Sequence, residues 1–126
     1  MNILVPVSLG ELLDKIIILK IKKEKIRDTE KLRNINKELR ALNEIKRKAL
    51  KGRKGIRKWE KDLNKANRRI WDLEEIIRKK ESKRDYGVGF IQCARQIYKT
   101  NDLRALAKMK INMAIGSVIM EVKSYK

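Results

Sequence analysis

The stretch that decides the fold is residues 32–77, LRNINKELRALNEIKRKALKGRKGIRKWEKDLNKANRRIWDLEEII. Apolar side chains recur in it every three or four residues, which is the spacing of one face of an α-helix. They form two series, Leu32, Ile35, Leu39 and Leu42 in the first and Ile56, Trp59, Leu63, Ala66, Ile70, Leu73 and Ile77 in the second. Between the series, Gly52 and Gly55 can adopt the positive φ that ends one helix and reverses the chain. The stretch therefore predicts a long antiparallel helical hairpin.

The segment before the hairpin predicts an extended arm and a capped helix. Residues 1–7, MNILVPV, are apolar and contain the single proline of the chain. Ser8 and Glu11 have the spacing of a capping box, in which each side chain accepts a hydrogen bond from the backbone amide of the other residue. We therefore expect the first long helix over 8–50, with a kink or short break near residue 28.

The segment after the hairpin predicts two shorter helices. The second hairpin arm is expected over 56–83, and a helix over 88–98 follows a glycine-containing bend. Thr100 or Asn101 then supplies an N-cap for a last helix over 101–116. Together these elements predict an all-α protein of one domain, residues 1–126. We expect a long antiparallel helical hairpin, a capped N-terminal helix and two C-terminal helices that form a bundle.

Composition limits the classes of function. The formal net charge is +18, from 34 Lys and Arg against 16 Asp and Glu, so the molecule attracts polyanions. There is no histidine, which removes the commonest general base and the commonest zinc ligand. The only cysteine is Cys93, so no intrachain disulfide can form, which is typical of a reducing cytoplasm. We expect a cytoplasmic protein with no cofactor, no resident metal and no membrane span.

The sharpest electrostatic feature of the sequence is the tip of the predicted hairpin. Between residues 46 and 58 there are eight cations and no acidic residue: Lys46, Arg47, Lys48, Lys51, Arg53, Lys54, Arg57 and Lys58. A glycine-containing loop that leads into a helix N-terminus offers backbone amides and a favourable dipole to phosphate. The tip predicts a non-enzymatic protein that binds a polyanion, nucleic acid above all, through phosphate contacts. The alternative is a solvated tip whose charges are spread apart.

A second candidate site combines polar residues from the two ends of the chain: Glu11, Asp14, Lys15, Asn101, Asp102 and Arg104. If these ends meet, the protein is instead a small helical enzyme or a binding protein for a nucleotide or sugar phosphate. The repeated acidic pairs of a helical magnesium site are missing, so we assign no metal ligand and no catalytic residue. A third reading is a scaffold or inhibitor that binds an acidic protein.

The apolar pattern also predicts self-association. Apolar residues over 9–21 spread wider than one helical stripe, which is typical of a helix that is central or contacts a second chain. The long arms of the predicted hairpin are also difficult to cover with so few residues. We therefore expect a homo-oligomer.

Several segments together resemble a family of short uncharacterised proteins from bacteria and phages, a domain of unknown function. The most specific segments are PVSLGELLDKI at 6–16, NDLRA at 101–105 and KSY at 123–125, and the resemblance covers nearly the whole chain. It implies a helical fold in the bacterial cytoplasm, or in the host cytoplasm if the protein is phage-encoded. It implies no established activity, so no catalytic residue is transferred from it.

Overall fold

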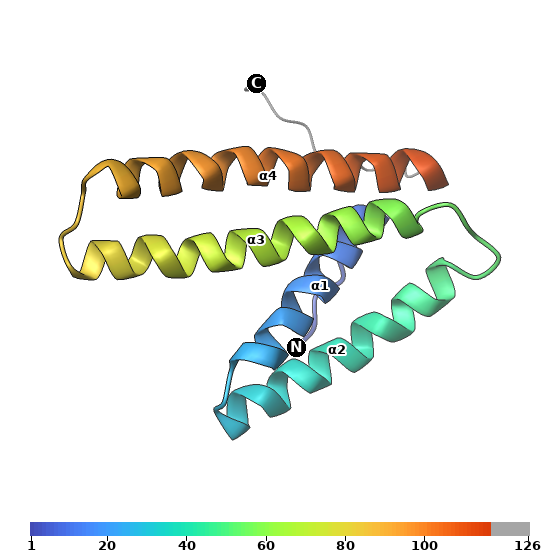
Figure 1. The fold of residues 1–126 in the computed structure, drawn as a ribbon. Coiled ribbons are helices and arrows are strands. Elements are labelled where there is room, and N and C mark those ends of the chain that lie inside the picture. The colour runs from blue at the N-terminus through green and yellow to red at the C-terminus, as the bar shows by residue number, and fades with distance from the viewer. Residues whose placement is uncertain (117–126) are drawn as a thin grey trace.

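The computed structural model describes residues 1–116, and this part of the chain folds into four helices without a strand (Figure 1). The helices are α1 (Leu9–Lys25), α2 (Thr29–Ala49), α3 (Arg57–Ser82) and α4 (Val88–Ile115). They pack on one another around a shared apolar core. The prediction of an all-α bundle is therefore confirmed. None of these helices is long and apolar enough to cross a membrane.

The central element is α1, which packs against all three other helices. Leu13, Ile16 and Ile21 are almost fully buried, and in Figure 1 the helix lies between α2 and the α3–α4 pair. The predicted cap is present at its start, where the Ser8 hydroxyl accepts a hydrogen bond from the Glu11 amide at 3.2 Å. The wide apolar surface of α1 thus reflects its position between two layers of helices.

The helix pairing differs from the predicted hairpin. The closely packed pair is α3 with α4, whereas α2 packs on α1 through Ile35 and Leu39 and diverges from α3 (Figure 1). Next to the connecting loop, the ion pair of Lys46 and Glu60, at 2.8 Å, still bridges α2 and α3. A helical stripe specifies that a face is buried but not which partner buries it. Here α1 takes the place that the second hairpin arm was expected to fill.

Two helix boundaries also need correction. The segment 8–50 is two helices, because Asp28 caps α2 by accepting from the Lys31 amide at 3.0 Å; this is the break expected near residue 28. The segments 88–98 and 101–116 are one helix, α4, so the two C-terminal helices and the cap between them were wrong. Thr100 is buried and Asn101 binds Arg104, and a cap-type residue with another partner can remain inside a helix.

The loop between α2 and α3 has the predicted glycine geometry. Gly52 and Gly55 have φ values of +74° and +94°, which residues with a Cβ rarely adopt. Ile56 at the end of the loop is buried in the core and holds the start of α3 against it. The loop therefore carries its exposed cations on a backbone that is anchored at both ends.

Candidate functional site

A buried carboxylate joins α1 to the α3–α4 pair. The Asp14 side chain is 4% exposed, and Arg104 from α4 binds both of its oxygens, with Nε donating to Oδ1 at 2.9 Å and Nη2 to Oδ2. Asn67 from α3 donates to the same Oδ1 at 2.8 Å. Arg104 is held in turn by Asn101, whose side-chain oxygen accepts from Nη1 at 3.2 Å. Four residues from three helices therefore form one network.

A second set of contacts continues this network towards the start of α1. Lys108 is 6% exposed, and its Nζ donates to Glu11 Oε1 at 2.8 Å. The Gly10 amide donates to Asn112 Oδ1 at 2.7 Å, and a Cβ on Gly10 would lie only 2.8 Å from the Lys108 carbonyl oxygen. Arg104, Lys108 and Asn112 are four residues apart, so they present one polar edge of α4 to α1.

The sequence-predicted polar cluster is only partly assembled. Glu11, Asp14, Asn101 and Arg104 come together, as described above. Lys15 is instead exposed and lies 3.7 Å from Glu38 of α2. Asp102 precedes Arg104 by two residues, which places it roughly 200° around the helix, on the far side of α4. Both residues were therefore wrongly included in this cluster.

The buried polar side chains of the network all have hydrogen-bond partners. Asp14 already accepts bonds on both oxygens, and no buried side-chain nitrogen or oxygen within residues 1–116 lacks a hydrogen-bond partner. A bidentate contact between a guanidinium and a carboxylate is strong and geometrically specific. The arrangement fixes α1 against α3 and α4.

At the tip, acidic residues just outside the predicted window engage several of the eight cations. Lys46 is paired with Glu60 at 2.8 Å, and Glu44 lies 2.6 Å from Arg47 and 4.0 Å from Lys48. Both Glu44 and Glu60 lie within one helical turn of the segment 46–58. The count of eight cations in that segment therefore overstated the positive charge that is free to bind an anion. Arg53 donates to the Ile115 carbonyl oxygen at 3.1 Å, which ties the loop to the end of α4.

The remaining cations of the tip are more available to bind an anion. Lys51, Lys54 and Arg57 are exposed and have no ion pair within residues 1–116. The Lys58 ammonium lies 4.1 Å from the centre of the Trp59 ring. From α4, the Lys110 ammonium lies 5.7 Å from the same ring, a contribution that the sequence run did not include. The tip is therefore positive from two helices as well as from its loop.

The outer surface of α2 extends this positive region. Arg33, Lys37 and Arg40 are exposed, and within the described part of the chain no salt bridge neutralises them. Their spacing of four and three residues places them on one side of the helix, where Glu44 follows one turn later, and Lys51 lies in the loop after α2. We call Arg33, Lys37, Arg40, Lys51, Lys54 and Arg57 the basic face.

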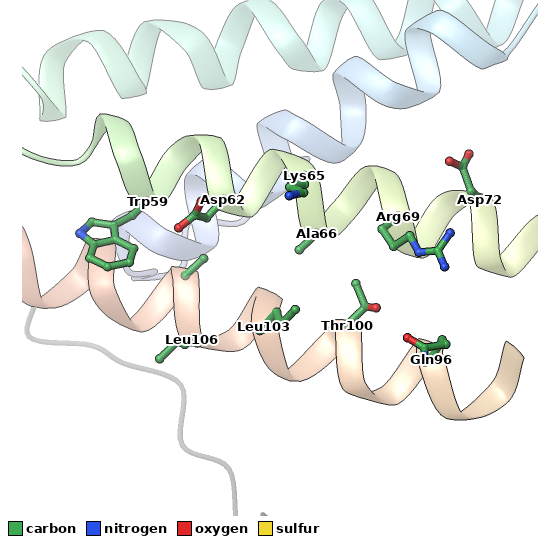
Figure 2. A pocket seen from close by; sticks show the side chains of 11 residues that line it. Trp59, Asp62, Lys65, Ala66, Arg69, Asp72, Gln96, Thr100, Leu103 and Leu106 are labelled. Carbon is green, nitrogen blue, oxygen red and sulfur yellow. The ribbon is translucent and has the colours of Figure 1, made fainter. Parts of the chain in front are cut away.

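A groove of about 640 Å³ runs between α3 and α4 (Figure 2). Its lining is mainly apolar, with Trp59 at one end and Gln96 at the other. The charged residues that line it are balanced in sign, Asp62 and Asp72 against Lys65 and Arg69. This groove therefore has none of the excess positive charge that distinguishes the basic face.

Comparison with known proteins places this chain among sequences without an assigned activity. A model of the family of unknown function DUF6165 matches residues 3–126. The chain belongs to this family. No curated protein and no solved structure matches it. The resemblance to a family of unknown function is confirmed, and assignment of a site in this family member depends on its own geometry.

One residue of the buried network, Asn67, was missed from the sequence. Asn67 interrupts the apolar stripe of α3, and a polar residue in such a stripe is a signal of a buried hydrogen bond. Lys108 and Asn112 continue the four-residue spacing that begins at Arg104 on a helix apolar over most of its surface. The position of each residue was visible in the sequence, but the partner on α1 was not.

Proposed function

We propose that the protein binds nucleic acid through the phosphate backbone, with the basic face as the contact surface. The observation that carries this proposal is a set of exposed cations without salt bridges among residues 1–116: Arg33, Lys37 and Arg40 on α2, and Lys51 and Lys54 in the loop that follows. Glu44, which lies between the two groups, is paired with Arg47. Phosphate contacts supply affinity and position but carry no base information. We therefore expect binding with little sequence preference.

The length of the basic face suits a nucleic-acid backbone. From Arg33 to Ala49, the last residue of α2, the helical rise gives a span of about 24 Å. A B-DNA strand carries one phosphate per 3.4 Å of axis, so this span corresponds to about seven base pairs. Cations three or four residues apart are separated by about 5–6 Å, and long, flexible side chains can adjust to successive phosphates.

The start of α3 gives independent support. Arg57 and Lys58 occupy its first turn, where the helix dipole favours negative charge, and no side chain caps this end of the helix. Glu60, the acidic residue of the same turn, is already paired with Lys46. A bound phosphate would compensate the two cations at the positive end of the α3 dipole. The start of α3 therefore favours an anion as its ligand.

The proposed location follows from the proposed partner. A nucleic-acid-binding protein of this family would act in the cytoplasm of a bacterium, or of the host cell if a phage encodes it. The single cysteine, Cys93, is buried and unpaired, which is compatible with a reducing compartment. The proposal includes no enzymatic activity and no cofactor.

The test compares two charge variants by fluorescence anisotropy on a short duplex DNA. One carries Arg33→Glu, Lys37→Glu and Arg40→Glu; the control carries Lys23→Glu, Lys79→Glu and Lys83→Glu, exposed positions away from the basic face. Both have the same net charge. We expect the first variant to lose binding and the control to retain most of it. Equal losses would show that only net charge matters, and an unbound wild type would refute the function.

Two further measurements separate nucleic acid from other anionic partners. If six cations contact phosphates, log K should fall with log[salt] at a slope of roughly −5 on duplex DNA. Polyglutamate serves as a competitor that mimics an acidic protein. Displacement of the DNA by polyglutamate at equal charge concentration would instead favour an acidic protein partner.

A further inference from the structure

The helix α4 is apolar on two opposite sides. One side buries Cys93, Ala107 and Ile111, as expected for a helix that packs on α1 and α3. The opposite side carries a second apolar series that is 37–70% exposed: Val88, Ile91, Tyr98, Leu106, Met109 and Met113. With Arg95 and Asp102 between them, these residues form the outer stripe of α4. In Figure 1 the other helices lie on one side of α4 only, so within residues 1–116 nothing covers this stripe.

The outer stripe is complementary to itself when it is reversed. Val88 and Met109 lie at equal distances on either side of the Tyr98–Lys99 peptide bond, and so do Ile91 and Leu106. Arg95 and Asp102 are related by the same point. Two copies of α4 packed antiparallel about this centre would therefore place apolar residues opposite apolar residues and each arginine opposite an aspartate.

The two charged residues of the stripe have no ion pair of their own. Neither Arg95 nor Asp102 forms a salt bridge within residues 1–116. They are seven residues apart on one helix, about 10.5 Å along its axis, which is too far for a direct pair. In the antiparallel arrangement Arg95 of each copy would meet Asp102 of the other copy, which gives two ion pairs related by the two-fold axis.

We infer that the outer stripe of α4 is a homodimer interface in which the α4 helices of two copies pack antiparallel around Tyr98. The occupant is a second copy because the apolar pairs and the charge pairs are matched by a single reversal of the same sequence. The stripe contains one positive and one negative residue, so this interface is chemically distinct from the basic face and independent of nucleic-acid binding.

The test measures the dimer dissociation constant of the full chain by sedimentation equilibrium. Ile91→Glu places a charge in the stripe and should weaken the dimer at least tenfold. Ile45→Glu, on α2, is the matched control because Ile45 and Ile91 are 52% and 55% exposed. Far-ultraviolet circular dichroism verifies the helix content of each variant. A monomeric wild type, or equal effects of the two substitutions, would overturn the inference.

Charge exchange tests the antiparallel register itself. Arg95→Asp and Asp102→Arg each replace two attractive pairs with two repulsive ones, so each variant alone should dimerise at least about tenfold more weakly. The double exchange should restore the dimer, and an equimolar mixture of the single variants should form a heterodimer. If neither combination restores association, the proposed pairing of Arg95 with Asp102 is refuted. Neither Arg95, which is exposed, nor Asp102, which is half-buried, belongs to the hydrophobic core, so this test does not depend on whether Ile91→Glu unfolds the protein.

Discussion

At the scale of single residues, the Asp14–Arg104 pair illustrates how a buried charge is stabilised without being available for chemistry. The carboxylate is buried in the fold and receives hydrogen bonds from Arg104 and Asn67. Removing one partner of a buried pair leaves the other partner desolvated and uncompensated, and this costs more than the pair contributes in net stability.

The first residue-scale prediction concerns this pair. Asp14→Leu should lower the free energy of unfolding by about 3 kcal/mol, because it removes the carboxylate that accepts hydrogen bonds from Arg104 and Asn67 inside the fold. Asp14→Leu combined with Arg104→Met should cost clearly less than the sum of the single changes. Urea unfolding followed by circular dichroism measures all three variants. Additive costs would mean that the two side chains are not energetically coupled in the folded protein.

A second residue-scale prediction uses two glycines near helix starts. Gly10→Ala should destabilise the protein by about 1–3 kcal/mol, because the added methyl group would lie 2.8 Å from the Lys108 carbonyl oxygen. Gly89→Ala should be neutral or stabilising by up to about 1 kcal/mol, because its nearest neighbour is the flexible end of Lys80. Thermal unfolding measures both variants. A stable Gly10→Ala protein would show that α1 and α4 can separate without cost.

At the scale of helices, the sequence predicted the helical stripes but not their pairing. The stripe of α3 from Trp59 to Ile77 is helical as expected, yet it faces α1 and α4 because α1 separates it from α2. The buried site shows the same limit. Asp14 and Arg104 were both candidates, but they lie 90 residues apart, and only the packing of α1 against α4 brings them together. Local periodicity contains no information about such distant partners.

One helix-scale prediction concerns the Glu24–Arg68 pair, which joins the end of α1 to α3. Arg68 donates to both Glu24 oxygens, at 2.7 and 2.8 Å, and these hydrogen bonds lower the pKa of Glu24 below its ordinary value. Its contribution to stability is therefore present above the ordinary pKa of a glutamate and is lost as the pH falls through the lower folded pKa. A carbon-13 NMR titration should show this low midpoint.

The matched control for that titration is Asp85 in the loop between α3 and α4. The pKa of Asp85 is also lowered, chiefly by the hydrogen bond from the Gly87 amide and then by Lys80. Arg68→Gln should therefore raise the midpoint of Glu24 towards its ordinary value and leave the midpoint of Asp85 in place. A shift of both midpoints would indicate a general loss of structure instead of the loss of one pair.

At the scale of the whole molecule, a net charge of +18 on 126 residues opposes compact folding through self-repulsion. Arg33, Lys37 and Arg40 add to this repulsion from one exposed side of α2 and have no salt bridge among residues 1–116. Such an arrangement is costly in the free protein, and the proposed binding of a polyanion would offset this cost. Substitutions that remove positive charge from the basic face should therefore raise the stability of the free protein and weaken its binding to polyanions.

The last prediction tests this opposition by thermal unfolding in low and in physiological salt. Arg33→Glu, Lys37→Glu and Arg40→Glu together remove six units of charge, so the net charge falls from +18 to +12. At low salt this variant should melt at a higher temperature than the wild type, and added salt should narrow the difference because it screens the repulsion. The Lys23, Lys79 and Lys83 control, with the same net charge, should gain similar stability while it keeps DNA binding. If salt leaves the melting temperature of the wild type unchanged, charge repulsion does not measurably destabilise the free protein. The basic face would then not lower the stability of the free protein, and the proposed opposition between stability and binding would be refuted.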